Sequence, residues 1–204
     1  MSETSTIERL RVYRKTYWAM LVSSSLSLIA SLVLSYDAIK LAEKPAGKLA
    51  CDINAVVSCG KVAKSWQSSL LGFPNSFIGL MLEPVIITVA IAGLSLVAFP
   101  KKFMRAAHIG YGLGLIFALW LLSQSLFAIH ALCPWCLLVT ISTVTVFSTI
   151  TRIVIMENHW SLSAERHQKL VDFLDRGWGR VLYTVTYAVL ILAIYFKYGQ
   201  EILS

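Results

Sequence analysis

The chain has 204 residues, of which 57% are hydrophobic and 14% are charged, and its mean hydropathy is +0.70. These values exclude an ordinary soluble domain of this size and indicate a membrane protein with several spanning segments. The net charge is +7, but the sequence has no soluble basic patch or basic segment interleaved with aromatic residues of the kind that binds nucleic acid. Membrane topology and contact with anionic lipid therefore explain the charge better than nucleic-acid binding does.

Five stretches are long and apolar enough to cross a bilayer as helices, which takes about 20 residues each. In chain order they are residues 16–40, 76–99, 106–132, 133–156 and 181–198. The first runs well past the apolar core of a typical signal peptide and lacks a clear cleavage site, so we expect it to remain as a spanning helix. The whole chain, 1–204, is predicted to be a single all-α membrane domain with a long loop at residues 41–75.

That loop contains a short amphipathic segment, residues 61–72, in which apolar side chains recur at helical spacing. They are Val62, Trp66 and Leu70. Because the segment is too short to span a membrane, we expect a half-helix lying at the interface. Gly72 is predicted to end it, and Asn75 or Ser76 to cap the next helix.

The orientation in the membrane follows from the basic residues, which collect near span ends on the cytoplasmic side. Most of the 18 Lys and Arg residues fall on one side of the predicted spans. They are Arg9, Arg11, Arg14, Lys15, Lys101, Lys102, Arg105, Arg152, Arg166, Lys169, Arg176 and Arg180. This pattern predicts a cytoplasmic amino terminus, an extracytoplasmic carboxy terminus, and all four cysteines outside.

The cysteines form two pairs of different spacing. Cys133 and Cys136 belong to a CPWC motif that opens the fourth span, where Pro134 suits the first turn of a helix. Cys133 is therefore predicted to lie near the N-cap, where free backbone N–H groups and the helix dipole favour a thiolate. Four cysteines on the oxidising side of a membrane, in two such pairs, indicate redox chemistry.

The other pair, Cys51 and Cys59, is eight residues apart. On one regular helix that separation is about 12 Å, beyond the roughly 7 Å limit for a disulfide. The segment is therefore either a loop when the two cysteines are joined or a helix when they are not, and a segment that must bend to close its own bridge suits a shuttle between partners. Two alternatives remain, a pair of structural disulfides and a zinc site, although the spacing lacks the paired short intervals of structural zinc.

Several other residues are candidates for a binding site. Glu83 lies inside the second span, where a carboxylate is costly, so it is predicted to face a cavity or to snorkel to the outer surface. Trp135, Phe73 and Phe77 can wall an aromatic pocket or belong to an interfacial belt. Three glycines in the third span indicate close helix packing. They are Gly110, Gly112 and Gly114.

Together these motifs resemble the vitamin K epoxide reductase (VKOR) family in its bacterial branch. The resemblance rests on four cysteines in the order Cx7C then CxxC, on "CDINAVVSC", on "GFPNSFIGL" and on CPWC, and it covers roughly residues 16–156. It implies a four-helix bundle around a quinone, capped by the cysteine loop and the half-helix, with a fifth helix outside. Many bacterial members continue into a thioredoxin-like domain; this chain ends at "KYGQEILS", so a separate DsbA-like partner is expected.

The resemblance also implies roles for residues. Electrons are expected to pass from the partner to Cys51 and Cys59, then through Cys133 to Cys136 and the quinone. Asn75 corresponds to a residue that hydrogen-bonds the quinone. Members often carry a tyrosine contacting the quinone four residues after the last cysteine, and that position is Thr140 here. Menaquinone is the favoured quinone and ubiquinone the alternative, in a bacterial cytoplasmic membrane.

Three classes of function are therefore open. The favoured one is a quinone-linked thiol oxidase that drives disulfide formation in exported proteins. A quinone or vitamin K epoxide reductase would use the same fold with thiols as reductant, and a membrane scaffold would use the cysteines as structural bridges. DsbB-type oxidases perform similar chemistry, but their CxxC pair precedes the widely spaced pair, which is the reverse of this order.

Overall fold

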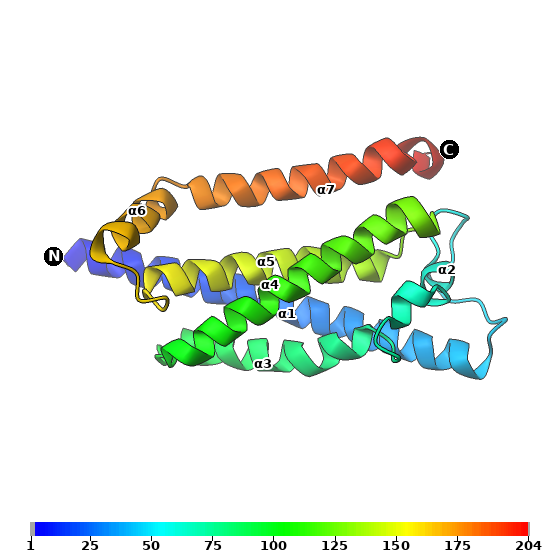
Figure 1. The fold of residues 1–204 in the computed structure, drawn as a ribbon, viewed down its shortest axis with the longest axis horizontal. Helices are drawn as coiled ribbons and strands as arrows, with labels where there is room; N and C mark the ends of the chain where they lie inside the picture. Colours follow the sequence, from blue (N-terminus) through cyan, green and yellow to red (C-terminus); the bar gives the residue numbers. More distant parts are fainter. Residues whose placement is uncertain (1–2, 204) are drawn as a thin grey trace.

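The computed structural model describes residues 3–203, with side chains described for residues 13–199. These residues form helices joined by loops (Figure 1). In chain order the elements are α1 (Glu3–Glu43), α2 (Cys59–Ala63), the 3-10 turn η1 (Trp66–Ser69), α3 (Ser76–Leu94), α4 (Lys101–Gln124), the π-helical turn η2 (Ser125–Ile129), α5 (Pro134–Met156), α6 (Ala164–Asp175) and α7 (Trp178–Leu203).

Among the described residues, five helical segments are long and apolar enough to cross a membrane. They are Tyr13–Glu43, Ser76–Leu94, Lys101–Ile129, Pro134–Met156 and Trp178–Gly199. This confirms the all-α class and the expected number of spans. Consecutive spans alternate in direction: α1, α4 and α7 run one way, and α3 and α5 run the other way (Figure 1).

Two span boundaries differ from those expected. The second span was predicted to reach residue 99, but α3 ends at Leu94, because Leu96 takes a left-handed conformation with φ 61° and Pro100 disfavours helix at the residue before it. The third was predicted at 106–132, but α4 begins earlier, at Lys101, since basic side chains at a helix end reach out of the apolar layer. Its continuation η2 stops before His130, which is left-handed.

The bundle is made by α1, α3, α4 and α5. α1 packs along both α3 and α5, and α4 packs along α5. Gly79 and Gly93 on α3 make the first contact close, because a Cβ at either would collide with Ser31 or Tyr17 of α1. At the end of the bundle near the cysteines, Ser35 Oγ donates to Ser76 Oγ at 2.9 Å.

The half-helix expected over residues 61–72 is instead two short pieces, α2 and η1. The hydroxyls of Ser65 and Ser68 donate to the carbonyls of Val62 and Ala63, and such local bonds compete with helix propagation. Gly72 does end the segment, with φ 83°. The result is a folded cap over one end of the bundle, which we call the cysteine end.

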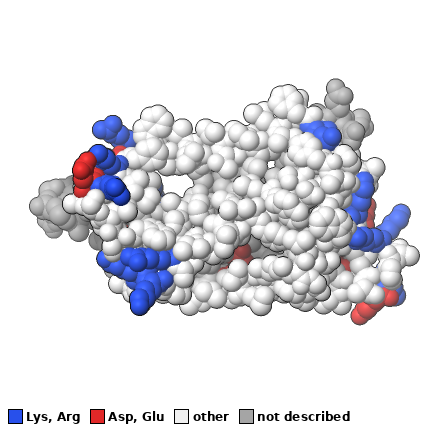
Figure 2. All heavy atoms as spheres, viewed as in Figure 1, with Lys and Arg blue, Asp and Glu red and all other residues white. Residues whose placement is uncertain are grey.

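The fifth spanning helix, α7, lies outside the bundle (Figure 1). Polar side chains hold it there: Tyr187 Oη donates to the carbonyl of Ile141 at 2.8 Å, and Tyr198 Oη donates to that of Leu126 at 3.2 Å. Charged side chains gather at the two ends of the molecule and leave a broad, mostly uncharged belt between them (Figure 2). That distribution suits a protein crossing a bilayer.

Candidate active site

Cys133 lies at the N-cap of α5, as the motif predicted, with Pro134 in the first turn. Its sulfur accepts a hydrogen bond from the backbone N–H of Cys136 at 3.4 Å. The Cys136 thiol and the backbone N–H groups of Cys136 and Trp135 lower the pKa of the Cys133 thiol and outweigh its burial, which acts in the opposite sense. These contacts favour loss of the Cys133 proton during exchange, although only 2% of the residue is exposed.

Cys51 and Cys59 form a disulfide with their Cα atoms 5.6 Å apart. Residues 51–58 form a loop, which is the alternative expected for a joined pair, and Cys59 begins α2. The two sulfurs differ in access, because Cys51 is partly exposed while only 1% of Cys59 is exposed. An external thiol can reach Cys51 far more easily than Cys59.

Asp52 fixes the shape of this loop. Its carboxylate accepts hydrogen bonds from the backbone N–H groups of Leu49 and Gly60, both at 2.8 Å, and from the Ser58 hydroxyl at 2.7 Å. Burial by itself raises the pKa of Asp52, but these bonds outweigh it and hold the pKa below its usual value. Gly60 must be a glycine here, since a Cβ would lie 2.7 Å from the carboxylate.

The loop is joined to the segment before α5, so residues far apart in sequence lie together. A short bridge pairs Val57 with Leu132: the N–H of Ser58 donates to the Leu132 carbonyl at 3.0 Å, and the Leu132 N–H donates to the Val56 carbonyl at 2.7 Å. The free thiol of Cys133 consequently lies 3.4 Å from the sulfur of Cys59. A disulfide and a dithiol in such contact are placed for thiol-disulfide exchange.

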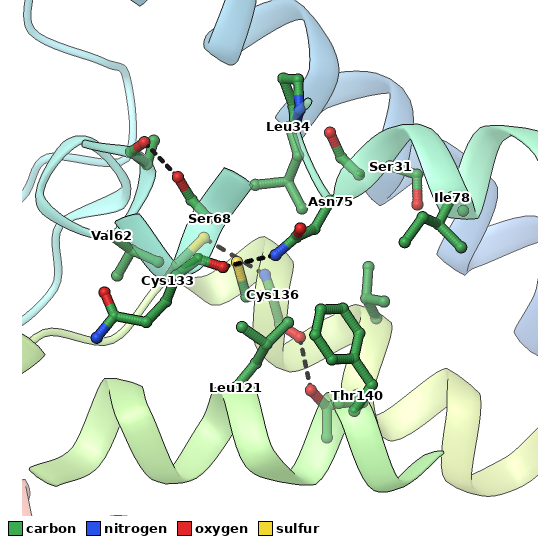
Figure 3. Close-up of a pocket in the computed structure, with 18 of the residues that line it drawn as sticks. Ser31, Leu34, Val62, Ser68, Asn75, Ile78, Leu121, Cys133, Cys136 and Thr140 are labelled. Carbon is green, nitrogen blue, oxygen red and sulfur yellow. Dashed lines mark hydrogen bonds between the residues drawn. The ribbon is translucent and has the colours of Figure 1, made fainter. Parts of the chain in front are cut away.

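A cavity of about 470 Å³ lies directly beneath the cysteines, within the size range of small-molecule sites. Cys59, Cys133 and Cys136 line one end of it, and helices α1, α3, α4 and α5 form its walls. Figure 3 shows the two free cysteines facing the same space as Asn75 and Thr140. Most of the lining is apolar, with contributions such as Leu34, Ile78 and Leu121.

Asn75 places an amide at the cavity wall but does not cap α3 with its side chain, contrary to one of the two roles expected of it. Its Nδ2 donates instead to the Gln67 carbonyl at 2.7 Å (Figure 3). Because that bond fixes the amide orientation, Oδ1 is the buried acceptor left without a partner among the described residues. Such an atom is costly unless a ligand supplies a donor.

The other predicted contacts divide into two groups. Thr140 and Glu83 line the cavity, although the Thr140 hydroxyl is occupied by the Cys136 carbonyl at 2.9 Å. Phe73, Phe77 and Trp135 do not line it. Phe73 and Phe77 stack on each other, and Trp135 packs on the apolar cluster around Cys59 and Cys133.

Residues of α4 complete the wall and were not expected there. Gly110, Gly114, Phe117 and Leu121 line the cavity, and their spacing of four, three and four residues places them on one helix face. A Cβ at Gly110 or Gly114 would meet open space, so these glycines do not serve close packing as predicted; Gly112 approaches Phe147. The helical periodicity of this face was the signal available in the sequence.

Within the described residues, no group of three or more His, Cys, Asp or Glu side chains is arranged to hold a metal ion. Compared with models of known protein families, the chain matches the one described as the Vitamin K epoxide reductase family, over residues 18–151. That range contains α1 from Trp18 onwards, the cysteine loop, the cap, α3, α4, α5 as far as Thr151, and all four cysteines. No curated protein matches the sequence.

Proposed function

The chain belongs to the vitamin K epoxide reductase family, and we propose that it reoxidises a separate thioredoxin-like protein at the expense of a membrane quinone. Family membership makes it a membrane oxidoreductase that links thiols to quinones. The finer assignment depends on one observation: the Cys51–Cys59 disulfide and the free Cys133–Cys136 pair meet at 3.4 Å, directly above the cavity.

The cavity suits a quinone head group on chemical grounds. Its walls are mostly apolar, the Asn75 amide lies at the wall with Oδ1 unpaired within the part of the chain that the structure describes, and a free thiol, Cys136, lines the same space. When bound there, a quinone would supply an acceptor for two electrons and two protons. Asn75 would hold the quinone by donating its second Nδ2 proton to a carbonyl oxygen, and Oδ1 would accept from a hydroxyl of the quinol formed by reduction.

The exchange steps follow from access and contact. A partner thiolate attacks the sulfur of Cys51, the more accessible of the two, and releases Cys59, and the partner's second thiol then completes the partner's own disulfide. Cys59 in turn attacks Cys133 of an oxidised inner pair, which releases Cys136 towards the cavity. Cys51 then closes on Cys59 again. The redox state in the structure, with the loop pair oxidised and the inner pair reduced, is the one that follows this internal transfer.

The proposed setting is a bacterial cytoplasmic membrane, with the cysteine end outside. Lys101, Lys102 and Arg105 lie at the opposite end of the bundle, as the bias of basic residues towards the cytoplasm requires. A DsbA-like protein is the partner we propose, and menaquinone is favoured over ubiquinone. Outward-facing cysteines would meet partners in an oxidising compartment.

The test uses the purified protein in lipid with a reduced thioredoxin-like protein and a soluble quinone, and follows quinone absorbance. We expect Cys133→Ala and Cys136→Ala to abolish turnover even when a small dithiol replaces the protein partner. Cys51→Ala and Cys59→Ala should abolish turnover only with the protein partner. Ser148→Ala, deeper on α5 and outside the cavity, is the matched control. Absence of quinone consumption by the wild type would refute the proposal and favour structural bridges.

A further inference from the structure

A carboxyl group lies deep in the cavity and has no role in the exchange of disulfides. Glu83 is part of spanning helix α3, only 4% of it is exposed, and it lines the same cavity as Cys136. It does not snorkel to the surface, which was one of the two alternatives for it. Tyr111 of α4 donates a hydrogen bond from Oη to Glu83 Oε2 at 3.0 Å, and Ser27 of α1 lies beside the carboxyl.

The surroundings of Glu83 favour the neutral acid. Lys64 is the only Lys or Arg among the described residues that line the cavity, and it lies exposed on the cap at the cysteine end. A carboxylate without a cation in a membrane interior is costly, so the group retains a proton. The acid then has one O–H to donate, while Tyr111 occupies an oxygen of the same carboxyl as a donor.

The position of this acid complements that of the thiols. α3 and α5 both begin at the cysteine end (Figure 1). Glu83 is seven residues beyond Ser76, about 10 Å along α3, whereas Cys136 is two residues beyond Pro134, about 3 Å along α5. The acid thus lies about two turns into its helix and the thiol in the first turn of its own, and a ring held in the cavity that both line would meet polar groups of two kinds.

We propose that Glu83, held in place by Tyr111, donates a hydrogen bond and then a proton to the quinone oxygen that lies farther from Cys136. The inference rests on the proposed function, because it assigns the source of a proton in that reaction. It goes beyond the cysteine relay by making a membrane-embedded acid a catalytic residue.

Protons and electrons balance over one turnover. The Cys133–Cys136 dithiol becomes a disulfide and releases two electrons and two protons. Both electrons pass to the quinone, one dithiol proton passes to the nearer oxygen, and the carboxylic proton of Glu83 passes to the farther oxygen. The second dithiol proton then returns to the Glu83 carboxylate. The acid therefore ends the turnover as it began, and the products are a disulfide and a quinol.

A purely structural role, in which Glu83 only links α3 to α4, predicts different results for a neutral replacement. Glu83→Gln keeps the size of the side chain and an acceptor for the Tyr111 hydroxyl, so it retains the link, but it cannot release a proton. Glu83→Asp retains an acid on a shorter side chain. Thr88→Val, on an exposed position of the same helix, is the matched control.

The experiment compares the wild type and the variants in lipid. It measures binding of a soluble short-chain quinone to the oxidised protein and the single-turnover rate at which the reduced protein reduces that quinone. It also records the infrared difference spectrum between the protein before and after quinone reduction. We expect Glu83→Gln to bind quinone as the wild type does and to reduce it about 100-fold more slowly or worse, the usual scale for loss of a general acid. Glu83→Asp should recover part of the rate. Tyr111→Phe, which loses a neutral hydrogen bond, should lose about three- to tenfold.

The infrared spectrum keeps the proposal testable even if Glu83→Gln does not fold. Glu83 is the only carboxyl among the described residues that line the cavity, so a carboxylic C=O band of the wild type should shift on quinone reduction. The same band should shift in Thr88→Val. A Glu83→Gln protein with the wild-type rate, or a wild-type spectrum without a carboxylic change, overturns the inference and leaves the cysteine relay intact. A wild type that does not reduce quinone at all overturns both.

Discussion

Asp52 should set the rate at which electrons cross from the loop pair to the inner pair. The carboxylate uses Oδ1 for Ser58 and Gly60 and Oδ2 for the N–H of Leu49. In Asp52→Asn an amide NH2 replaces one oxygen, so we expect the bond to Leu49 to be lost. A hydrogen bond to a charged group is worth about 1.5–3 kcal/mol, and the lower end applies because Asp52 is partly exposed.

A loss of about 1.5 kcal/mol corresponds to roughly tenfold. We therefore expect the loop arrangement that places Cys59 against Cys133 to be about tenfold less populated, and oxidation of a reduced thioredoxin-like protein in a single turnover to slow by the same factor. Quinone reduction by the fully reduced protein should keep its rate, because the cavity is unchanged. Glu43→Gln, which removes an exposed carboxyl near the loop, is the control. Equal rates for Asp52→Asn and Glu43→Gln would refute the role of the loop bonds.

Three further outcomes follow from the same contacts. Because the pKa of Asp52 is lowered on folding, its contribution to the stability of the loop should be complete above the ordinary pKa of about 3.9 and should disappear only as the pH falls below that value. A relay rate that already falls near pH 6 because the loop opens would contradict this. Gly60→Ala should cost about 1–3 kcal/mol of stability, seen in thermal unfolding, because its Cβ would press on the Asp52 carboxylate. Asn75→Ala should raise the KM for quinone about tenfold with little change in kcat, and an unchanged KM would remove Asn75 from the binding site.

The sequence was sufficient for features governed by local chemistry. Apolar stretches of spanning length gave the five helices, and the CPWC motif gave the N-cap position of Cys133 because proline and a helix start impose that geometry. Because a disulfide cannot connect two residues eight apart on a regular helix, a joined Cys51–Cys59 pair was predicted to lie on a loop. Each of these inferences needs only neighbours in the chain.

Features that depend on how helices pack could not be obtained in this way. The pairing of Glu83 with Tyr111 joins two helices, and composition does not specify which faces meet. Phe73 and Phe77 have the composition of a pocket wall, but they stack on each other beside the cavity, while Phe117 from α4 lines it. The break between α2 and η1 arises from serine hydroxyls that bond to nearby carbonyls, a competition that apolar periodicity does not reveal.

The order of the relay is tested most directly by trapping its central bond. In the double variant Cys51→Ala, Cys136→Ala, the sulfurs of Cys59 and Cys133 remain 3.4 Å apart with no other cysteine to resolve them. We predict that mild oxidation in lipid gives a Cys59–Cys133 disulfide in nearly all molecules, identified by mass spectrometry of the linked peptides. The matched variant Cys59→Ala, Cys136→Ala should leave Cys51 and Cys133 unlinked. Free thiols in the first variant, or an equally efficient bond in the second, would contradict a relay that passes through Cys59.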